Sequence, residues 1–250
     1  MKKIFNFTKK KKHGTPDNGS VLSAGYDLKD KDLGKIHKAA LQADLAKLRQ
    51  LVKKNDINQL DKDNRTALHI ACASGHVEVV QFLVENKAKL NLCDNQNRSA
   101  LMKAVQGQHE RCVSILLENH AEPNVVDVNG NTALHLAANI PSISTAVLLL
   151  QHGAEIDAQN KEGFTPLAVA VREDHIEMAE FLLKESSDVN SVDQDQRPVS
   201  NSKTLCCIIY KLSRASPTGL EACCLTYFSR CLCPNSFAHL LVRSCRAAAL

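Results

Sequence analysis

The sequence predicts an all-α fold, a solenoid of stacked helix pairs with projecting β-turn hairpins. Three observations predict it. A short motif recurs every 33 residues, starting at Thr66, Ser99, Thr132 and Thr165. Each unit holds two apolar segments with helical spacing, and a polar turn of the form Asp-x-x-Asn/Gly precedes each motif. Such a unit is too small to bury its own apolar face, so the units must stack.

Two further rows of polar residues keep the same step, and together with the motif they place five positions in phase. The first row is Asn58, Asn91, Asn124, Asp157 and Asn190, and the second is Asp61, Asp94, Asp127, Asn160 and Asp193.

The elements of one unit follow from its local sequence. Thr66 is an N-cap residue that can accept a hydrogen bond from an early backbone N–H. The first helix carries an apolar stripe and ends at Gly75-His76 after about two turns. A longer apolar helix follows from Val77, and the polar turn at 94–97 leads into the next unit.

The stretch NRTALHIACASGH (64–76) and its counterparts resemble ankyrin repeats, over roughly residues 28–195. The stretches MKKIF, GYDLKDKDLGKIHKAA and NRSALMKAVQ resemble the POTE-related group of ankyrin repeat domain proteins, a resemblance that implies relatives often expressed in testis. The expected organisation has seven segments: a basic arm (1–27), a degenerate capping unit (28–60), four repeats (61–93, 94–126, 127–159, 160–192) and a broken repeat with a Cys-rich tail (193–250). Both termini are expected to be poorly ordered.

Histidines in the repeat motif give the stretch at 64–76 the look of an active site. The resemblance instead implies that His37, His69 and His135 hydrogen-bond to backbone across the turn, a role that Met102 and Ala168 cannot fill. We regard the other histidines, His109, His120, His152, His175 and His239, as scattered outside the repeat phase.

Several positions depart from the family pattern. Ankyrin repeats place Gly after the second helix, where φ is positive, but this chain has Lys87, His120, Gly153 and Ser186 there. We expect these residues to be left-handed and the array to be only modestly stable. Pro141 replaces the Gly between two helices and is tolerable there if it opens a turn.

The pattern breaks abruptly at Pro198, which suggests a truncated splice variant with little independent stable function as an alternative to a competent scaffold. The tail after this point holds seven of the ten cysteines. Their adjacent or one-residue spacing does not match a structural zinc site, so we expect an oxidation-prone segment. Residues 205–212 are expected to cover the apolar side of the last unit.

Charge and motifs restrict the function class. Residues 1–13 carry +6 and residues 199–250 carry +5, which leaves −7 for the middle of a chain of net charge +4. An acidic body argues against nucleic-acid binding by the repeats. The sequence holds no nucleophile elbow, phosphate loop or zinc-protease motif, so we expect no enzyme, cofactor or metal.

The resemblance implies a non-catalytic scaffold for an intracellular protein partner. The matching tip positions are Lys62, Asp63, Arg65, Asn95, Gln96, Arg98, Val128, Asn129, Asn131, Lys161, Glu162 and Phe164. The matching inner-helix positions include Gln106, Asn139, Ile140, Arg172 and Glu173. Because arginine and aromatic residues are frequent hot spots, we expect Arg65, Arg98 and Phe164 to anchor the partner.

The lysine-rich arm leaves three interpretations open: a solvated tail, an anchor to an anionic membrane, or a nuclear-import signal at 9–12. No secretory signal or membrane span is evident, so we expect a monomeric cytoplasmic protein with a nuclear location as the alternative. The resemblance also implies asparagine hydroxylation, at Asn190 and, with a poorer match, at Asn124.

Overall fold

The computed structural model describes residues 33–188, and within this range the chain is built from ten α-helices. In chain order these are α1 (Lys35–Leu41), α2 (Leu45–Val52), α3 (Ala67–Ser74), α4 (Val77–Glu85), α5 (Ala100–Gln106), α6 (Glu110–Glu118), α7 (Ala133–Asn139), α8 (Ile143–Gln151), α9 (Pro166–Arg172) and α10 (Ile176–Lys184). The described part contains no named strand, only one isolated bridge between Cys93 and Ser99. The predicted all-α fold is confirmed.

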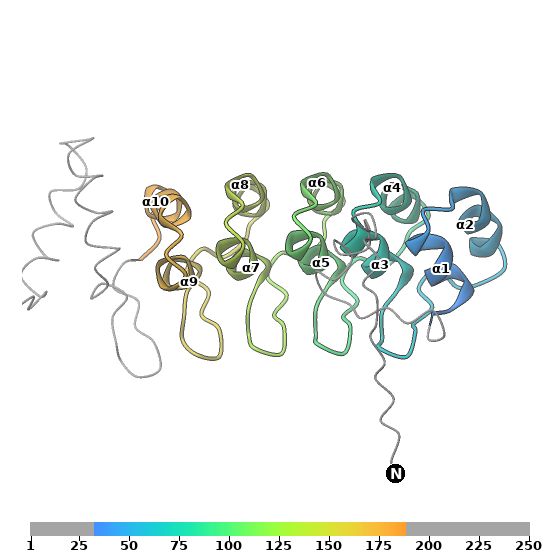
Figure 1. Cartoon of the computed structure of the whole chain (residues 1–250), viewed down its shortest axis with the longest axis horizontal. Helices are drawn as coiled ribbons and strands as arrows, with labels where there is room; N and C mark the ends of the chain where they lie inside the picture. Colours follow the sequence, from blue (N-terminus) through green and yellow to red (C-terminus); the bar gives the residue numbers. More distant parts are fainter. Residues whose placement is uncertain (1–32, 189–250) are drawn as a thin grey trace, which may run out of the picture.

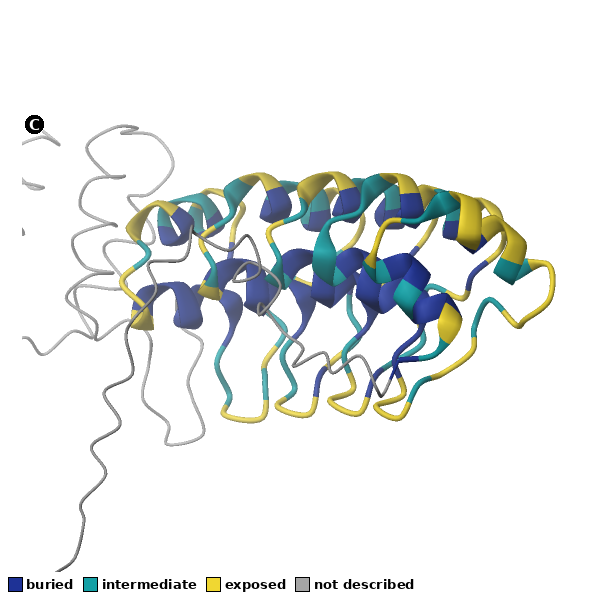
Figure 2. Cartoon of the chain, turned by 45° about the vertical axis from the view of Figure 1, so that its right-hand side comes forward, coloured by how far each residue is buried: buried dark blue, intermediate teal, exposed yellow. Residues whose placement is uncertain are grey.

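The helices form two layers (Figure 1). The odd-numbered helices lie side by side in one layer, the even-numbered helices form the other, and the long turns project away from the odd-numbered layer. Buried residues concentrate where the layers face each other (Figure 2). The stacked helix pairs and projecting turns are as predicted from the sequence.

Identical positions of successive units build the core. Leu68, Leu101, Leu134 and Leu167 of the odd-numbered helices are buried, as are Leu83, Leu116, Leu149 and Leu182 of the even-numbered helices. Alanines at 71, 104, 137 and 170 are fully buried and let neighbouring helices approach closely. The core therefore continues from unit to unit without large aromatic residues.

Hydroxyl caps start the odd-numbered helices, as predicted for Thr66. The backbone N–H of His69 donates to Thr66 Oγ1, and Ser99 and Thr165 cap α5 and α9 in the same way. At α3 the ring of His69 reciprocates, because its Nδ1 accepts the backbone N–H of Thr66 at 3.2 Å. An accepting Nδ1 requires that the proton of the neutral ring is on Nε2.

That Nε2 proton links each of these units to the next. Nε2 of His37 donates to the Arg65 carbonyl at 2.9 Å, and His69 donates to the Arg98 carbonyl at 3.0 Å. His135 donates to the Phe164 carbonyl at 2.9 Å. The expected hydrogen bonds of these three histidines are confirmed, and they join different units rather than forming a catalytic group.

A second row of histidines links the units at the opposite end of the odd-numbered helices. His76 donates to the Leu41 carbonyl at 2.9 Å, His109 to the Ala73 carbonyl at 3.2 Å and His175 to the Ala138 carbonyl at 2.9 Å. The view of His109 and His175 as scattered was wrong. They stand one and three units beyond His76, and the step of 33 residues could have revealed them.

The predicted asparagine row forms a third link. The side-chain oxygens of Asn58, Asn91 and Asn124 accept the backbone N–H of Lys89, Glu122 and Glu155, at 2.8–3.0 Å. Asp157 accepts the N–H of Asp188 at the same position of the last described unit. Each of these bonds joins residues 31 apart, so the row fixes the spacing of successive units.

The expected left-handed residues are also found. Lys87, His120, Gly153 and Ser186 have φ of 64°, 65°, 85° and 71°. Pro141 lies in the turn between α7 and α8, as expected, although the equivalent positions Gly75, Gln108 and Asp174 have positive φ. The arm, the broken repeat, the Cys-rich tail and Asn190 lie outside the described residues, so the predictions for them are not tested.

We predict that Lys87→Gly and His120→Gly each raise the free energy of unfolding by about 1 kcal/mol, because glycine adopts positive φ without a Cβ clash. Urea denaturation measures this. Gly153→Ala is the matched control and should lower stability by a similar amount, since a Cβ there meets nothing within 4 Å and the cost is conformational alone. Unchanged stability in all three variants would contradict the prediction.

We also predict that stability falls between pH 7 and pH 5. Burial lowers the pKa of His69 and His135 below the ordinary value of 6.5, so the unfolded chain takes up protons that the folded chain does not. Stability is therefore complete above about pH 6.5 and is lost as the pH falls further. Urea denaturation at each pH measures the slope, and the double variant His69→Gln/His135→Gln should have a shallower one. An equal slope would refute this origin.

Candidate protein-binding surface

The projecting turns, which we call fingers, comprise residues 61–65, 94–98, 127–131 and 160–164. One carboxylate or amide oxygen holds each finger. Oδ1 of Asp61 accepts the N–H groups of Asp63 and Arg65 at 2.9 and 2.8 Å, and Asp94, Asp127 and Asn160 do the same in their fingers. This explains the second in-phase row of the sequence: its members shape the fingers and are not a catalytic acid cluster.

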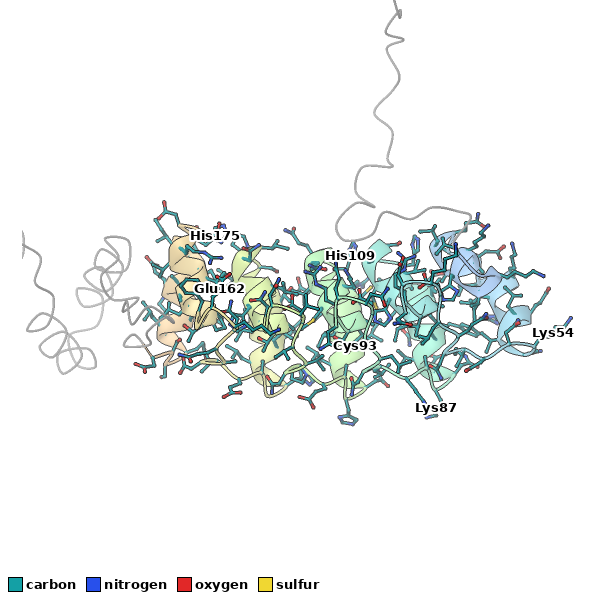
Figure 3. The ribbon with its side chains drawn as sticks, turned by 90° about the horizontal axis from the view of Figure 1, so that it is seen from below. Lys54, Lys87, Cys93, His109, Glu162 and His175 are labelled. Atoms are coloured by element: carbon teal, nitrogen blue, oxygen red, sulfur yellow. The ribbon has the colours of Figure 1, made fainter. Side chains whose placement is uncertain are left out.

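Backbone hydrogen bonds join neighbouring fingers. The N–H of Asn95 donates to the Asp63 carbonyl, Val128 to Gln96, and Lys161 to Asn129, at 2.9–3.0 Å. The fingers thus form a continuous edge along the array (Figure 1). Figure 3 looks onto this edge, with His109 and His175 along one side and Lys87 on the opposite side.

Most of the predicted tip residues are accessible at this edge. The exposed ones are Lys62, Asp63, Asn95, Gln96, Val128, Asn129, Lys161 and Glu162, while Arg98, Asn131 and Phe164 are half-buried. Among the predicted inner-helix residues, Asn139, Arg172 and Glu173 are exposed, and Gln106 and Ile140 are half-buried. We call these sixteen residues together the contact face.

Arg65 is a correction to the predicted surface. Its residue is only 2% exposed, and Nε lies 2.6 Å from Asp61 Oδ2 while Nη2 lies 3.0 Å from Asp63 Oδ2. Its backbone carbonyl accepts the proton of His37. A guanidinium committed to two carboxylates in the interior braces the first finger and cannot anchor a partner.

Arg98 keeps partial access to solvent. Its side chain is 18% exposed, with Nε 3.5 Å from Asp127 Oδ2 and Nη1 3.5 Å from Gln106 Oε1. Both distances are longer than a good charge-assisted hydrogen bond. The guanidinium therefore lies between the second and third fingers and still has donors to offer.

Phe164 forms a cluster with Arg172 at the last described finger. The guanidinium lies over the ring, 4.8 Å from its centroid, in cation–π geometry. Arg172 is also 3.4 Å from Glu162 Oε2 and 3.1 Å from Glu173 Oε1. These exposed ion pairs contribute little stability, but they hold an aromatic ring and a guanidinium together at the surface.

A buried lysine was missed by the sequence prediction. Lys103 of α5 is fully buried, and its Nζ lies 3.8 Å from Asp94 Oδ2. Burial lowers its pKa from 10.5 to about 8, while Asp94 acts in the opposite direction. The equivalent positions of the other repeats hold Ile70, Leu136 and Val169, so a charge at an apolar phase position was the available signal.

The amide of Asn124 is committed to the array. Its Nδ2 donates to the Gly153 carbonyl at 3.0 Å, and its Oδ1 accepts the N–H of Glu155 at 2.9 Å. The residue is half-buried. Its hydroxylation stays a prediction, and a modifying enzyme would have to draw the segment away from the next unit.

Two further searches covered residues 33–188. They contain no group of three His, Cys, Asp or Glu residues placed to hold a metal ion. No helix in this range has the length and apolar character that crossing a membrane requires.

Comparison with known proteins gives a consistent result. A family model described as "Ankyrin repeats (3 copies)" matches residues 36–127 and 117–193, which is more than half of the chain. Ankyrin repeat domain-containing protein 7 of Homo sapiens is 46% identical over 91 residues. That match covers 36% of this chain and 33% of that protein, so the chain matches about a third of its relative's length.

We predict that Lys103→Met raises the free energy of unfolding at pH 7 by about 1–2 kcal/mol, because it removes a charge that is costly to bury and keeps the volume. Lys103→Ala should be less stable than Lys103→Met because it leaves a cavity. The unfolded-state pKa of 10.5 exceeds the folded value of about 8, so the wild type should regain stability relative to Lys103→Met as the pH rises from 8 to 10. Chemical denaturation measures all three, and a less stable Lys103→Met protein would contradict the account.

Proposed function

Because the chain belongs to the ankyrin repeat family, we propose that it is a non-catalytic scaffold that binds a protein partner through the contact face. Repeats of this family generally mediate protein–protein interaction and are typically non-catalytic. The observation that carries the proposal is the division of labour in the fingers. Backbone groups, Asp61, Asp94, Asp127 and Asn160 shape them, while the exposed tip side chains differ from one finger to the next.

The strongest anchors lie in the half of the contact face nearer the C-terminus. Val128 is 45% exposed at a fingertip, where an apolar side chain contributes nothing to the core. Phe164 under Arg172 adds the aromatic and guanidinium pair typical of hot spots. Arg98 supplies donors toward the middle of the face. Val128 takes the place of Arg65 in the predicted set of anchors.

The expected chemistry of the partner follows from this face. Its apolar residues are few and isolated, and its charges alternate in sign, as with Lys161 beside Glu162. A mixed surface of this kind suits a folded or extended polypeptide that contributes one or two apolar side chains and a carboxylate. A polyanion such as nucleic acid would require a one-sign basic face.

Two narrower proposals concern segments outside the described residues. A lysine-rich arm of +6 would hold the scaffold at an anionic membrane or direct it to the nucleus. A truncated splice variant with little independent stable function would lack a cooperative unfolding transition, whereas a competent scaffold would unfold cooperatively.

We predict that the triple variant Val128→Asp/Phe164→Ala/Arg172→Ala loses at least about tenfold in affinity for the partner, since hot-spot residues carry most binding energy. Affinity capture with the full chain, followed by quantitative mass spectrometry, identifies proteins that the variant no longer retains. The matched control Gln81→Ala/Glu118→Ala/Gln151→Ala alters exposed residues of the even-numbered helices and should retain them. Partners lost with the control but kept by the triple variant would refute the proposed face.

A further inference from the structure

The junctions between successive described units are held at both ends of the odd-numbered helices, and the histidines act there as clamps. One clamp is a motif histidine that donates to the carbonyl ending the next finger, as His69 does to Arg98. The other is a turn histidine that donates back to the preceding unit, as His109 does to Ala73. The junctions α1/α3, α3/α5 and α7/α9 each have both clamps.

The junction between α5 and α7 has neither. Met102 occupies the motif position, and its thioether has no proton to donate to the Asn131 carbonyl. Ser142 occupies the turn position, and its hydroxyl donates to Thr145 Oγ1 at 2.8 Å within its own unit. Four unit-to-unit junctions are described, and only here are both histidines replaced.

Other features of this junction agree. Pro141 replaces the left-handed residue that precedes α4, α6 and α10. Helices α5 and α7 also touch less extensively than any other successive pair in their layer. Arg98 Nε and Asp127 Oδ2 face each other across the junction at 3.5 Å, and neither atom makes a hydrogen bond. The exposed bond from Ser144 to Glu110 contributes little in water.

The remaining links at α5/α7 are those that every junction of this type has. The N–H of Val128 donates to the Gln96 carbonyl at 3.0 Å, and the N–H of Glu155 donates to Asn124 Oδ1 at 2.9 Å. In a repeat array, stability is approximately a sum over units and their nearest-neighbour interfaces. The interface with the fewest bonds is therefore where the array separates most readily.

We infer that the α5/α7 junction is a built-in seam, the place where the array opens first and divides into the blocks 33–126 and 127–188. Each block keeps its clamped junctions. The seam separates the fingers at 61–65 and 94–98 from those at 127–131 and 160–164. The two parts of the finger edge can therefore change their relative inclination while each part stays folded.

Amide exchange of the full chain, followed by NMR, tests the seam with matched reporters. The N–H groups of Val128 and Glu155 bridge α5/α7, and those of Asn95 and Glu122 make the equivalent bonds across α3/α5. We expect Val128 and Glu155 to exchange at least about tenfold faster, because opening the seam breaks one or two fewer hydrogen bonds. Equal or slower exchange at Val128 and Glu155 would overturn the inference.

Two variants change the seam and its neighbour in opposite directions. Met102→His/Ser142→His supplies both missing clamps and should slow exchange at Val128 and Glu155 about tenfold. His109→Ser removes one clamp from α3/α5 and should accelerate Asn95 and Glu122 alone. A folded double variant with unchanged Val128 and Glu155 exchange, or a His109→Ser variant that leaves Asn95 and Glu122 unchanged, would contradict the seam. The wild-type and His109→Ser comparisons need no new core side chain, so they decide the matter even if the double variant does not fold.

Discussion

The structure depends on one constraint: no helix pair of this chain can bury its own apolar face. Each pair uses its neighbour as the missing half of its core, and the leucines and alanines at equivalent positions are buried only because the next unit covers them. Apolar contact alone would leave the register of the stack loose. Buried polar side chains set it, since His69, His109 and Asn91 each bond to the backbone of a neighbouring unit. Satisfying a buried carbonyl is worth more in register than in net energy.

The same constraint separates architecture from recognition. Residues that join units are buried and repeat in phase, so they cannot carry specificity for a partner. Arg65 belongs to this group despite its position in a finger, because Asp61 and Asp63 hold its guanidinium. Specificity is left to side chains that no neighbour needs, among which Val128 and the Phe164–Arg172 pair are the most distinctive. Repeats thus allow the contact face to vary while the stack is preserved.

Much of this was predictable from the sequence, because the step of 33 residues reports stacking directly. It predicted the helix pairs, the fingers, the Thr66 cap, the bonds of His37, His69 and His135, and the left-handed residues at 87 and 120. It did not separate Arg65 from the other tip residues, because burial depends on which carboxylates fold back onto the guanidinium. Lys103 was missed since three-dimensional packing decides whether a lysine at an apolar position turns outward or inward. His109 and His175 were within reach of the sequence, which carries their phase.

The central claim is that every unit is stable only through its neighbours. Leu116→Ala tests it most directly, because it creates a cavity in α6 alone and should cost about 2–4 kcal/mol. Native-state amide exchange of this variant should show lowered protection in α3 and α4 as well as in α5 and α6. If protection falls only within α5 and α6 while the helices on either side exchange as in the wild type, the units stand on their own and the account is wrong.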